Sequence, residues 1–152
     1  MSAREELHAA FRPVRSRRVA TVVGVAQAVV LVTLALVLPY SGPGAFQWYD
    51  RVGVVLMSAA VGWLLSRYAR IEAVPREDGL TVRNLLRARD LQWAEVVAVR
   101  FGSGDPWVTL DLSDGDTLAV MAVQRADGPR AQDEARRLST LVALHSRTAR
   151  DD

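Results

Sequence analysis

The sequence feature that most constrains this chain is a long apolar stretch close to its start. Residues 19–38 carry no charge, and their main polar interruptions are Thr21, Gln27 and Thr33. At about 1.5 Å per residue, a helix of this length spans roughly 30 Å, the thickness of the hydrocarbon core of a bilayer. A helix that is apolar on all faces needs lipid or a much larger protein around it. We therefore expect residues 19–39 to form a membrane-spanning helix.

A secretory leader is the alternative interpretation of the same stretch. A leader has a charged start, an apolar segment of about 7–15 residues and a small-residue cleavage site. The arginines before residue 19 fit the first of these, but the apolar segment is too long for the second. We therefore expect an anchor that stays in place. The alternative is an exported cell-envelope or secreted protein that uses the first span as its signal.

A second apolar stretch indicates a second span. Residues 52–66 are uncharged, and the extension to residues 46–68 gives a segment long enough to cross a bilayer. The extension brings aromatic residues to both ends, where one side of a ring meets lipid and the other meets water. Small residues on this span are expected to let the first helix pack closely. They are Gly53, Ser58, Ala59, Ala60 and Gly62.

The segment between the spans and the charges around them predict how the two helices lie in the membrane. Residues 39–45, PYSGPGA, contain two prolines and two glycines, which end a helix and favour a tight turn. The two spans are therefore expected to form a helical hairpin. Its flanks are rich in arginine: Arg12, Arg15, Arg17 and Arg18 before it, and Arg67, Arg70 and Arg76 after it.

Arginine-rich flanks stay on the cytoplasmic side of a membrane. We therefore expect a plasma-membrane protein with both termini in the cytoplasm. On this interpretation residues 1–18 are a basic cytoplasmic tail and residues 19–69 are the transmembrane hairpin.

From residue 70 onward the pattern changes to short alternating segments. Turn signals such as Asp78-Gly79 and Asp114-Gly115 separate them, which is typical of antiparallel strands. The expected strands are residues 71–74, 79–84, 87–91, 96–101, 107–113 and 117–123. Val108, Leu110 and Leu112 are expected to point inward, and Val97, Val99 and Phe101 are expected to share one face of their strand.

A single helix is expected to close the domain, with Asp127 as its N-cap. Its apolar residues fall on one side at helical spacing: Ala131, Ala135, Leu138, Leu141, Val142 and His145. The expected fold class is α+β. A two-helix transmembrane hairpin precedes a small antiparallel β-sheet or barrel, which one C-terminal helix caps, over residues 70–147. Residues 148–152 are expected to be a short tail.

Three stretches, in this order and behind a two-span hairpin, resemble a known family. They are GLTVRNLLRARDLQWAEVVAVRF, WVTLDLSDGDTLAVMAVQRADG and the terminal helix. They resemble the small membrane-tethered PH-like domain proteins of actinobacteria, in the bacterial PH domain family. The resemblance covers about residues 46–145. It implies a PH-like barrel with a capping helix, a membrane location and no established catalytic activity. The chain has six expected strands, where a full PH domain has seven.

Composition excludes several classes of function. The chain has no cysteine, which excludes a disulfide framework, a thiol nucleophile and a thiolate metal site. The net charge is +2, but from residue 70 onward 12 arginines face 14 carboxylates, a balance of 12 − 14 = −2. Such a domain lacks the basic face that binds nucleic acid. We expect no nucleic-acid partner.

Catalysis and metal binding have no motif in this sequence. Asp111, Asp114 and Asp116 do not have the spacing of a twelve-residue calcium loop. No serine, histidine and acid set stands in a recognisable context. We therefore expect no catalytic residue, no metal and no cofactor, and we expect that the chain is not an enzyme.

Four residues are candidates for contact with a ligand or partner. Arg83, Arg87 and Arg89 surround one hairpin and are candidates to bind a phospholipid head group or a phosphate on a partner. The alternative is an ordinary solvated edge. Trp93 is a candidate partner contact. The alternative is that Trp93 plugs one end of the barrel while Glu95 accepts hydrogen bonds from turn amides.

The function that we expect is a membrane-anchored PH-like binding or scaffold module. It would present its cytoplasmic domain to a membrane or cytoplasmic protein partner, which would add to an exposed strand edge or lie along the terminal helix. Confinement to a membrane raises the local concentration of the domain toward such partners. An anionic-lipid sensor is a further alternative. The lipid bilayer is an expected partner, and the hairpin is a candidate surface for a homo-oligomer.

Overall fold

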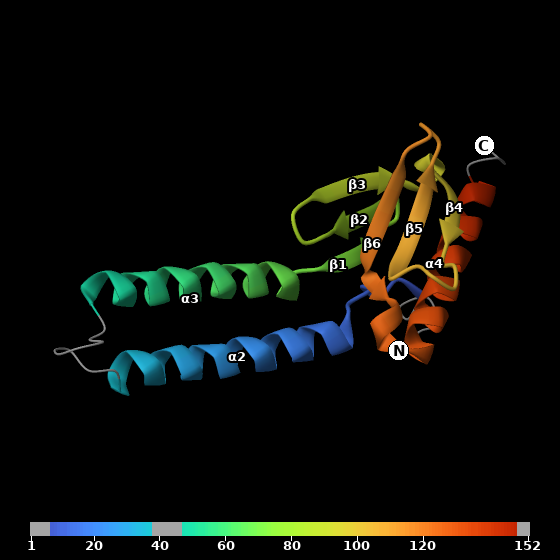
Figure 1. Ribbon diagram of the computed structural model, residues 1–152. Helices are drawn as coiled ribbons and strands as arrows, with labels where there is room; N and C mark the ends of the chain where they lie inside the picture. Colours follow the sequence, from blue (N-terminus) through green and yellow to red (C-terminus); the bar gives the residue numbers. More distant parts are fainter. Residues whose placement is uncertain (1–6, 38–46, 149–152) are drawn as a thin grey trace. The chain divides into compact units, whose positions relative to one another are not determined.

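The computed structural model describes residues 7–37 and 47–148 (Figure 1). The chain divides into two compact units. One unit is Arg17–Ala69, and the secondary structure of its described residues is helical. The other unit joins Met1–Ser16 to Arg70–Asp152 and contains the sheets.

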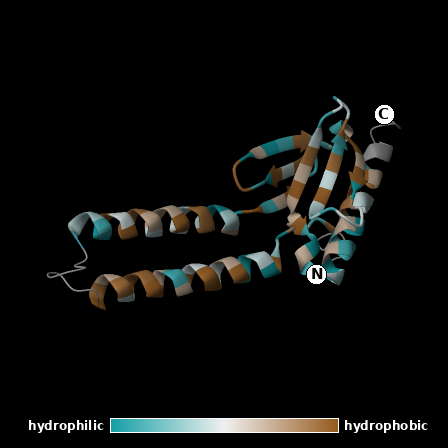
Figure 2. Ribbon diagram, viewed as in Figure 1, coloured by the Kyte–Doolittle hydropathy of each residue, from teal (hydrophilic) through white to brown (hydrophobic). Residues whose placement is uncertain are grey.

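The two long apolar helices predicted from the sequence are confirmed. Helix α2 is Val14–Val37 and helix α3 is Trp48–Ala69. Both are long and apolar enough to cross a membrane. Neither helix has a buried side chain, and apolar residues appear along both in the hydropathy colouring of Figure 2. The predicted turn at residues 39–45 lies outside the described residues.

Helices α2 and α3 contact each other along one face of each. A side chain at Gly24 would collide with the side chain of Leu65, so Leu65 packs closely against α2 at this position. Nearer the other end of the pair, Arg51 Nη1 donates a hydrogen bond of 2.7 Å to the carbonyl oxygen of Ala35. Half-buried residues at spacings of three and four mark this face on α2: Ala20, Gly24, Gln27, Leu31 and Ala35.

The glycines that were expected to bring the helices together are not the ones that do so. Space for a side chain is open at both Gly53 and Gly62, so these two predicted packing positions are wrong. The residues of α3 that are half-buried are instead spaced through Val54, Ser58, Val61 and Leu65. Spacings of three and four on one helix favour a partner helix over a random apolar surface.

The six predicted strands are confirmed, and they form two antiparallel sheets of three strands each (Figure 1). The first sheet has the order β1-β2-β3 and the second has the order β4-β5-β6. The strands are β1 (Glu72–Pro75), β2 (Gly79–Arg83), β3 (Ala88–Gln92), β4 (Val96–Arg100), β5 (Trp107–Leu112) and β6 (Thr117–Gln124). The turn between β5 and β6 depends on Gly115, whose φ of 87° favours glycine.

The core lies between the sheets and helix α4 (Pro129–Thr148). Val108, Leu110 and Leu112 all point inward, as their alternation predicted. The predicted apolar face of the terminal helix is also buried, with Leu138 and Leu141 fully inaccessible. On β4 a bulge shifts the register between Val96 and Ala98. A bulge re-aims side chains, and here Val96 is buried while Val97 is 66% exposed.

The segment before α2 is built into the domain. Phe11 is 1% exposed, and its N–H and C=O pair with the C=O and N–H of Ala73 at 2.8 and 3.0 Å, along the outer edge of β1. The guanidinium carbon of Arg137 lies 3.8 Å from the centre of the Phe11 ring. The described part of the predicted basic tail, residues 1–18, therefore contributes a core side chain.

Asp127 was predicted as the N-cap of the terminal helix, and this prediction is wrong. Helix α4 begins at Pro129, and Asp127 belongs to the short helix η2 (Arg125–Asp127). Its carboxylate accepts hydrogen bonds from the N–H groups of Val14 at 3.3 Å and Arg15 at 2.8 Å, the first residues of α2. The first N–H groups of a helix have no acceptor within the helix, and a carboxylate supplies one.

Candidate functional site

The three predicted arginines lie around the β2–β3 hairpin but do not converge on one point. Arg83 faces Ala88 across the ladder, and Arg89 faces Val82, so Arg83 and Arg89 point to opposite faces of the sheet. Arg83 Nη1 lies 3.1 Å from a carboxylate oxygen of Glu72. Arg89 Nη2 lies 3.2 Å from Asp114 on the β5–β6 turn. In the described chain, Arg87 forms no ion pair within 4.0 Å.

The pairing of Arg89 with Asp114 has an electrostatic consequence. The backbone N–H of Asp116 donates to the Asp114 carboxylate at 2.9 Å and is the main reason that the pKa of Asp114 is lowered. Arg89 lowers this pKa further. Both groups favour the ionised form of the Asp114 carboxylate.

Trp93 is a buried residue that joins separate parts of the domain. It lies in the short helix η1 (Trp93–Glu95) and is 4% exposed. Its indole N–H donates to the carbonyl oxygen of Arg76 at 3.0 Å, and its ring stacks on His145 with centroids 4.7 Å apart. Glu95 accepts a hydrogen bond of 2.6 Å from the N–H of Gln92. Trp93 thus links the β1–β2 turn to α4.

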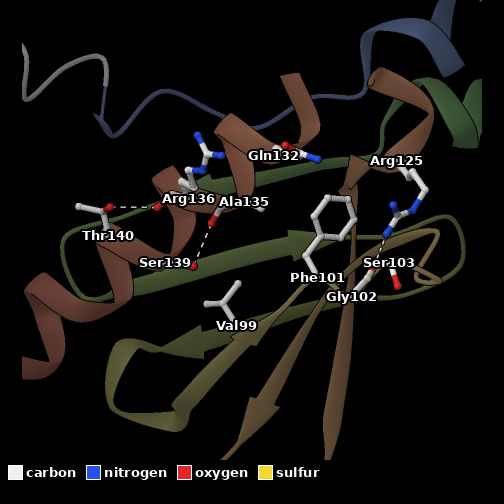
Figure 3. Close-up of a pocket in the computed structure, with 10 residues that line it drawn as sticks. All are labelled: Val99, Phe101, Gly102, Ser103, Arg125, Gln132, Ala135, Arg136, Ser139 and Thr140. Atoms are coloured by element: carbon white, nitrogen blue, oxygen red, sulfur yellow. Dashed lines mark hydrogen bonds between the residues drawn. The ribbon is translucent and has the colours of Figure 1, made fainter. Parts of the chain in front are cut away.

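A groove of about 670 Å³ runs between β4 and α4 (Figure 3). Its apolar part consists of Val99 and Phe101 on the strand side and Ala135 on the helix side. Ser139 and Thr140 also line it from α4. Their hydroxyl groups donate to carbonyl oxygens one turn back in the helix, at 3.0 and 2.9 Å, which leaves their oxygen atoms able to accept from a ligand.

Two arginines give the groove a positive charge. Arg125 is fixed at one end, because its guanidinium donates to the carbonyl oxygens of Gly102 and Asp105 and lies 5.0 Å from the centre of the Phe101 ring. Arg136 projects from α4 with its side chain 76% exposed, and among the described residues it pairs with Asp133 alone, at 3.5 Å. None of the described residues that line the groove is acidic.

The strand beside the groove is an edge strand. Within the described residues β4 pairs with β5 alone, so its other edge carries N–H and C=O groups that no strand of this chain takes up. Val97, Val99 and Phe101 were predicted to share one strand face. Val99 and Phe101 line the groove, whereas Val97 is exposed outside it, and the groove itself was not predicted. One signal in the sequence could have indicated the groove. VVAVRF has apolar residues on both strand faces, whereas a strand with a single core face needs them on only one.

A second hollow, of about 460 Å³, lies near the β1–β2 turn. Asp78, Asp90 and Glu95 line it together with the single arginine Arg76. Three carboxylates against one guanidinium disfavour a phosphate ligand at this end of the domain. Within residues 7–37 and 47–148, no three histidine, aspartate or glutamate side chains lie close enough to share a metal ion.

Comparison with known proteins gives a family for the sheet-bearing unit. Residues 70–140 match the family described as "Bacterial PH domain". Uncharacterized proteins of Mycobacterium tuberculosis and Mycobacterium bovis are each 36% identical over 86 residues, which are 57% of this chain and 56% of each relative. The matched region is thus only about half the length of these curated relatives. No solved structure matches the chain. None of these relationships indicates a catalytic family.

The matched residues contain both three-stranded sheets and most of the helix that caps them. The two long apolar helices precede this region. The part of this chain that matches the bacterial PH domain family is therefore its sheet-bearing part, residues 70–140.

Proposed function

We propose that this chain is a membrane-anchored binding module whose PH domain holds an extended segment of a protein partner between β4 and α4. The observation that carries this proposal is the free edge of β4 beside a groove that has an apolar floor. An extended segment forms main-chain hydrogen bonds with a free strand edge, while adjacent pockets receive alternate side chains.

The charge of the groove supports an acidic partner segment. Arg125 is already held in place by two carbonyl oxygens, so pairing with a carboxylate would cost it little side-chain entropy. Arg136 stands free enough to turn toward a ligand. Charge-assisted hydrogen bonds from a guanidinium to a carboxylate are among the strongest that a surface can offer.

Helices α2 and α3 would anchor the domain in the plasma membrane. Arginines flank the hairpin on both sides, which favours cytoplasmic placement of both termini. A domain held at a membrane meets other membrane proteins at a raised local concentration, so a weak groove contact would be enough for function.

Reporter fusions test the membrane arrangement. A reporter that is active only in the cytoplasm, fused to the C-terminus of the full chain, should be active. A reporter that is active only outside the cytoplasm should be silent at the same position. The mass of the chain should show that no N-terminal piece has been removed. An active outside reporter, or a cleaved chain, would instead support an exported protein whose first span is a signal.

Site-directed photocrosslinking in cells tests the groove. A photoreactive amino acid at Thr140, which lines the groove, should give a defined crosslinked protein. The same amino acid at Glu77, in the exposed β1–β2 turn, should not give this product. Arg136→Glu should weaken the crosslink, because one charge-assisted hydrogen bond contributes about 1.5–3 kcal/mol, or roughly tenfold or more in affinity.

Two further variants test whether the crosslink depends on the groove itself or on the surface of β4 in general. Val99→Arg fills the groove and should abolish the Thr140 crosslink. Val97→Arg changes an exposed residue of the same strand outside the groove and should leave the crosslink intact. Equal crosslinking from Thr140 and Glu77, or a Thr140 crosslink that survives both Val99→Arg and Arg136→Glu, would contradict the proposal.

A further inference from the structure

The turn between β2 and β3 carries an exposed leucine in an unusual setting. Leu85 and Leu86 form the tip of this hairpin, and Leu86 is 67% exposed. The tip is hydrophobic in the colouring of Figure 2. A single exposed leucine is ordinary on a protein surface. This one is different because of how the turn is held, what surrounds it and where it lies along the chain.

The turn is rigidly held, so the exposure of Leu86 is a fixed feature of the fold. The N–H of Asn84 donates to the carbonyl oxygen of Arg87 at 2.8 Å and closes the turn. The side-chain amide of Asn84 donates to the carbonyl oxygen of Ala119 at 2.7 Å, and its oxygen accepts from the N–H of Met121 at 3.1 Å. Asn84 thus ties the hairpin tip to β6.

The surroundings of the tip are positively charged. Arg87 follows the two leucines directly, and Arg83 precedes them with Asn84 in between. Arg12 joins them, because Glu72 accepts from Arg12 at 3.0 Å and from Arg83 at 3.1 Å. Three guanidinium groups against one carboxylate leave a charge of 3 − 1 = +2 at this end of the sheet. The side chains of Arg12 and Arg83 are 57% and 55% exposed, so they can reach a ligand in solvent.

The position of the tip follows from strand register. Glu72, the first residue of β1, lies opposite Arg83, the last residue of β2. The β2–β3 turn is therefore at the end of the sheet where β1 begins. Helix α3 ends at Ala69, three residues before β1. Three extended residues reach at most about 10 Å. The chain thus enters this end of the sheet directly from the second span.

We propose that the Leu85-Leu86 tip inserts into the head-group region of the bilayer that holds α2 and α3, and that Arg83 and Arg87 contact the phosphates of anionic phospholipids there. This inference rests on the membrane anchoring proposed above. An apolar tip between basic residues suits this boundary, because leucine leaves water for the acyl region while guanidinium groups meet negative lipid. The occupant of this surface is the bilayer itself.

The absence of cysteine from the chain permits a clean labelling experiment. A Leu86→Cys chain is labelled with an environment-sensitive fluorophore and placed at full length in nanodiscs. The discs contain phosphatidylcholine alone or phosphatidylcholine with phosphatidylglycerol. A matched Glu77→Cys chain carries the label on the exposed β1–β2 turn, at the other end of the same sheet.

The label at residue 86 should shift its emission to shorter wavelength and be quenched by brominated lipids, more strongly with phosphatidylglycerol. The label at residue 77 should remain solvent-like in both discs. Adding Arg87→Gln to the Leu86→Cys chain should remove most of the phosphatidylglycerol-dependent shift, because Arg87 has no carboxylate partner in the described chain.

A chain that co-purifies with the discs while both labels stay solvent-like would overturn the tip proposal and leave the anchoring proposal intact. A chain that does not enter the discs at all would overturn both. If the emission shift at residue 86 is the same with and without phosphatidylglycerol and is unchanged by Arg87→Gln, the proposed contact between arginine and anionic lipid is wrong.

Discussion

Replacing Phe11 by alanine is expected to lower the free energy of unfolding of the PH domain by about 3–5 kcal/mol. Phe11 is 1% exposed, and Arg137 covers the face of its ring. Removing the ring would leave a cavity at the outer edge of β1 and expose the underside of the Arg137 side chain. The loss would be large even though Phe11 lies 59 residues before the first residue of the family match, which is residue 70.

Hydrogen exchange of the full chain in detergent measures this loss of stability in the domain that contains Phe11. The amides of β1 and β5 should exchange faster in Phe11→Ala, because their protection depends on the stability of the whole domain. Phe11→Leu, which keeps most of the volume, should cost less. Val97→Ala, at an exposed position, should change stability by no more than about 0.5 kcal/mol. Equal protection in Phe11→Ala and Val97→Ala would show that Phe11 is not part of the core.

The burial of Phe11 means that part of the folded domain lies before residue 70. The matched residues 70–140 contain all six strands but not Phe11, whose backbone pairs with Ala73. A fragment that starts at residue 70 would leave the outer edge of β1 open and its core short of one aromatic ring. Studies of this domain should therefore keep residues 11–16, which means keeping helices α2 and α3, since the rest of α2 and the whole of α3 lie between these residues and β1.

Local sequence patterns predicted most of the secondary structure. Val108, Leu110 and Leu112 alternate with polar residues, and a period of two specifies a half-buried strand without knowledge of its neighbours. Gly115 follows an aspartate between two such segments, and its positive φ is what the turn requires. The face of α4 was likewise predictable from helical spacing, since it packs on one side only.

The features that the sequence did not reveal depend on partners far away in the chain. Asp127 looks like a helix cap from its neighbours, but it accepts from Arg15, 112 residues earlier. Phe11 was predicted to be part of a basic tail because four arginines follow it within seven residues. To predict the groove, one must know that β4 is an edge strand and that α4 lies beside it. Local hydrophobic periodicity indicates neither.

The candidate site was predictable only in part for the same reason. That Arg83 and Arg89 share one hairpin follows from the sequence. The sequence does not reveal that Arg83 pairs with Glu72 and Arg89 with Asp114, because Asp114 belongs to a turn of the other sheet. The three arginines therefore divide into Arg89, which pairs with Asp114 on the turn of the other sheet, and Arg83 and Arg87, which lie beside the exposed leucine tip.

Replacing Trp93 by alanine is the second change expected to have a large effect, a loss of about 3–5 kcal/mol in the free energy of unfolding. The indole is 4% exposed, stacks on His145 and donates to the carbonyl oxygen of Arg76. Its removal would separate the β1–β2 turn from α4 and leave the Arg76 carbonyl without its donor. Thermal unfolding of the full chain in detergent, with hydrogen exchange of α4 as the local readout, measures the loss.

Trp93→Phe separates packing from hydrogen bonding at this position. It keeps an apolar ring against His145 but removes the donor to Arg76, so it should cost about 1 kcal/mol or somewhat more. Its Thr140 crosslink to a partner should persist, because Trp93 does not line the groove. A Trp93→Ala chain that keeps its stability but loses the Thr140 crosslink would instead show that Trp93 contacts the partner. The burial of the indole favours the first pattern, since a ring that is already covered has little surface left to offer a partner.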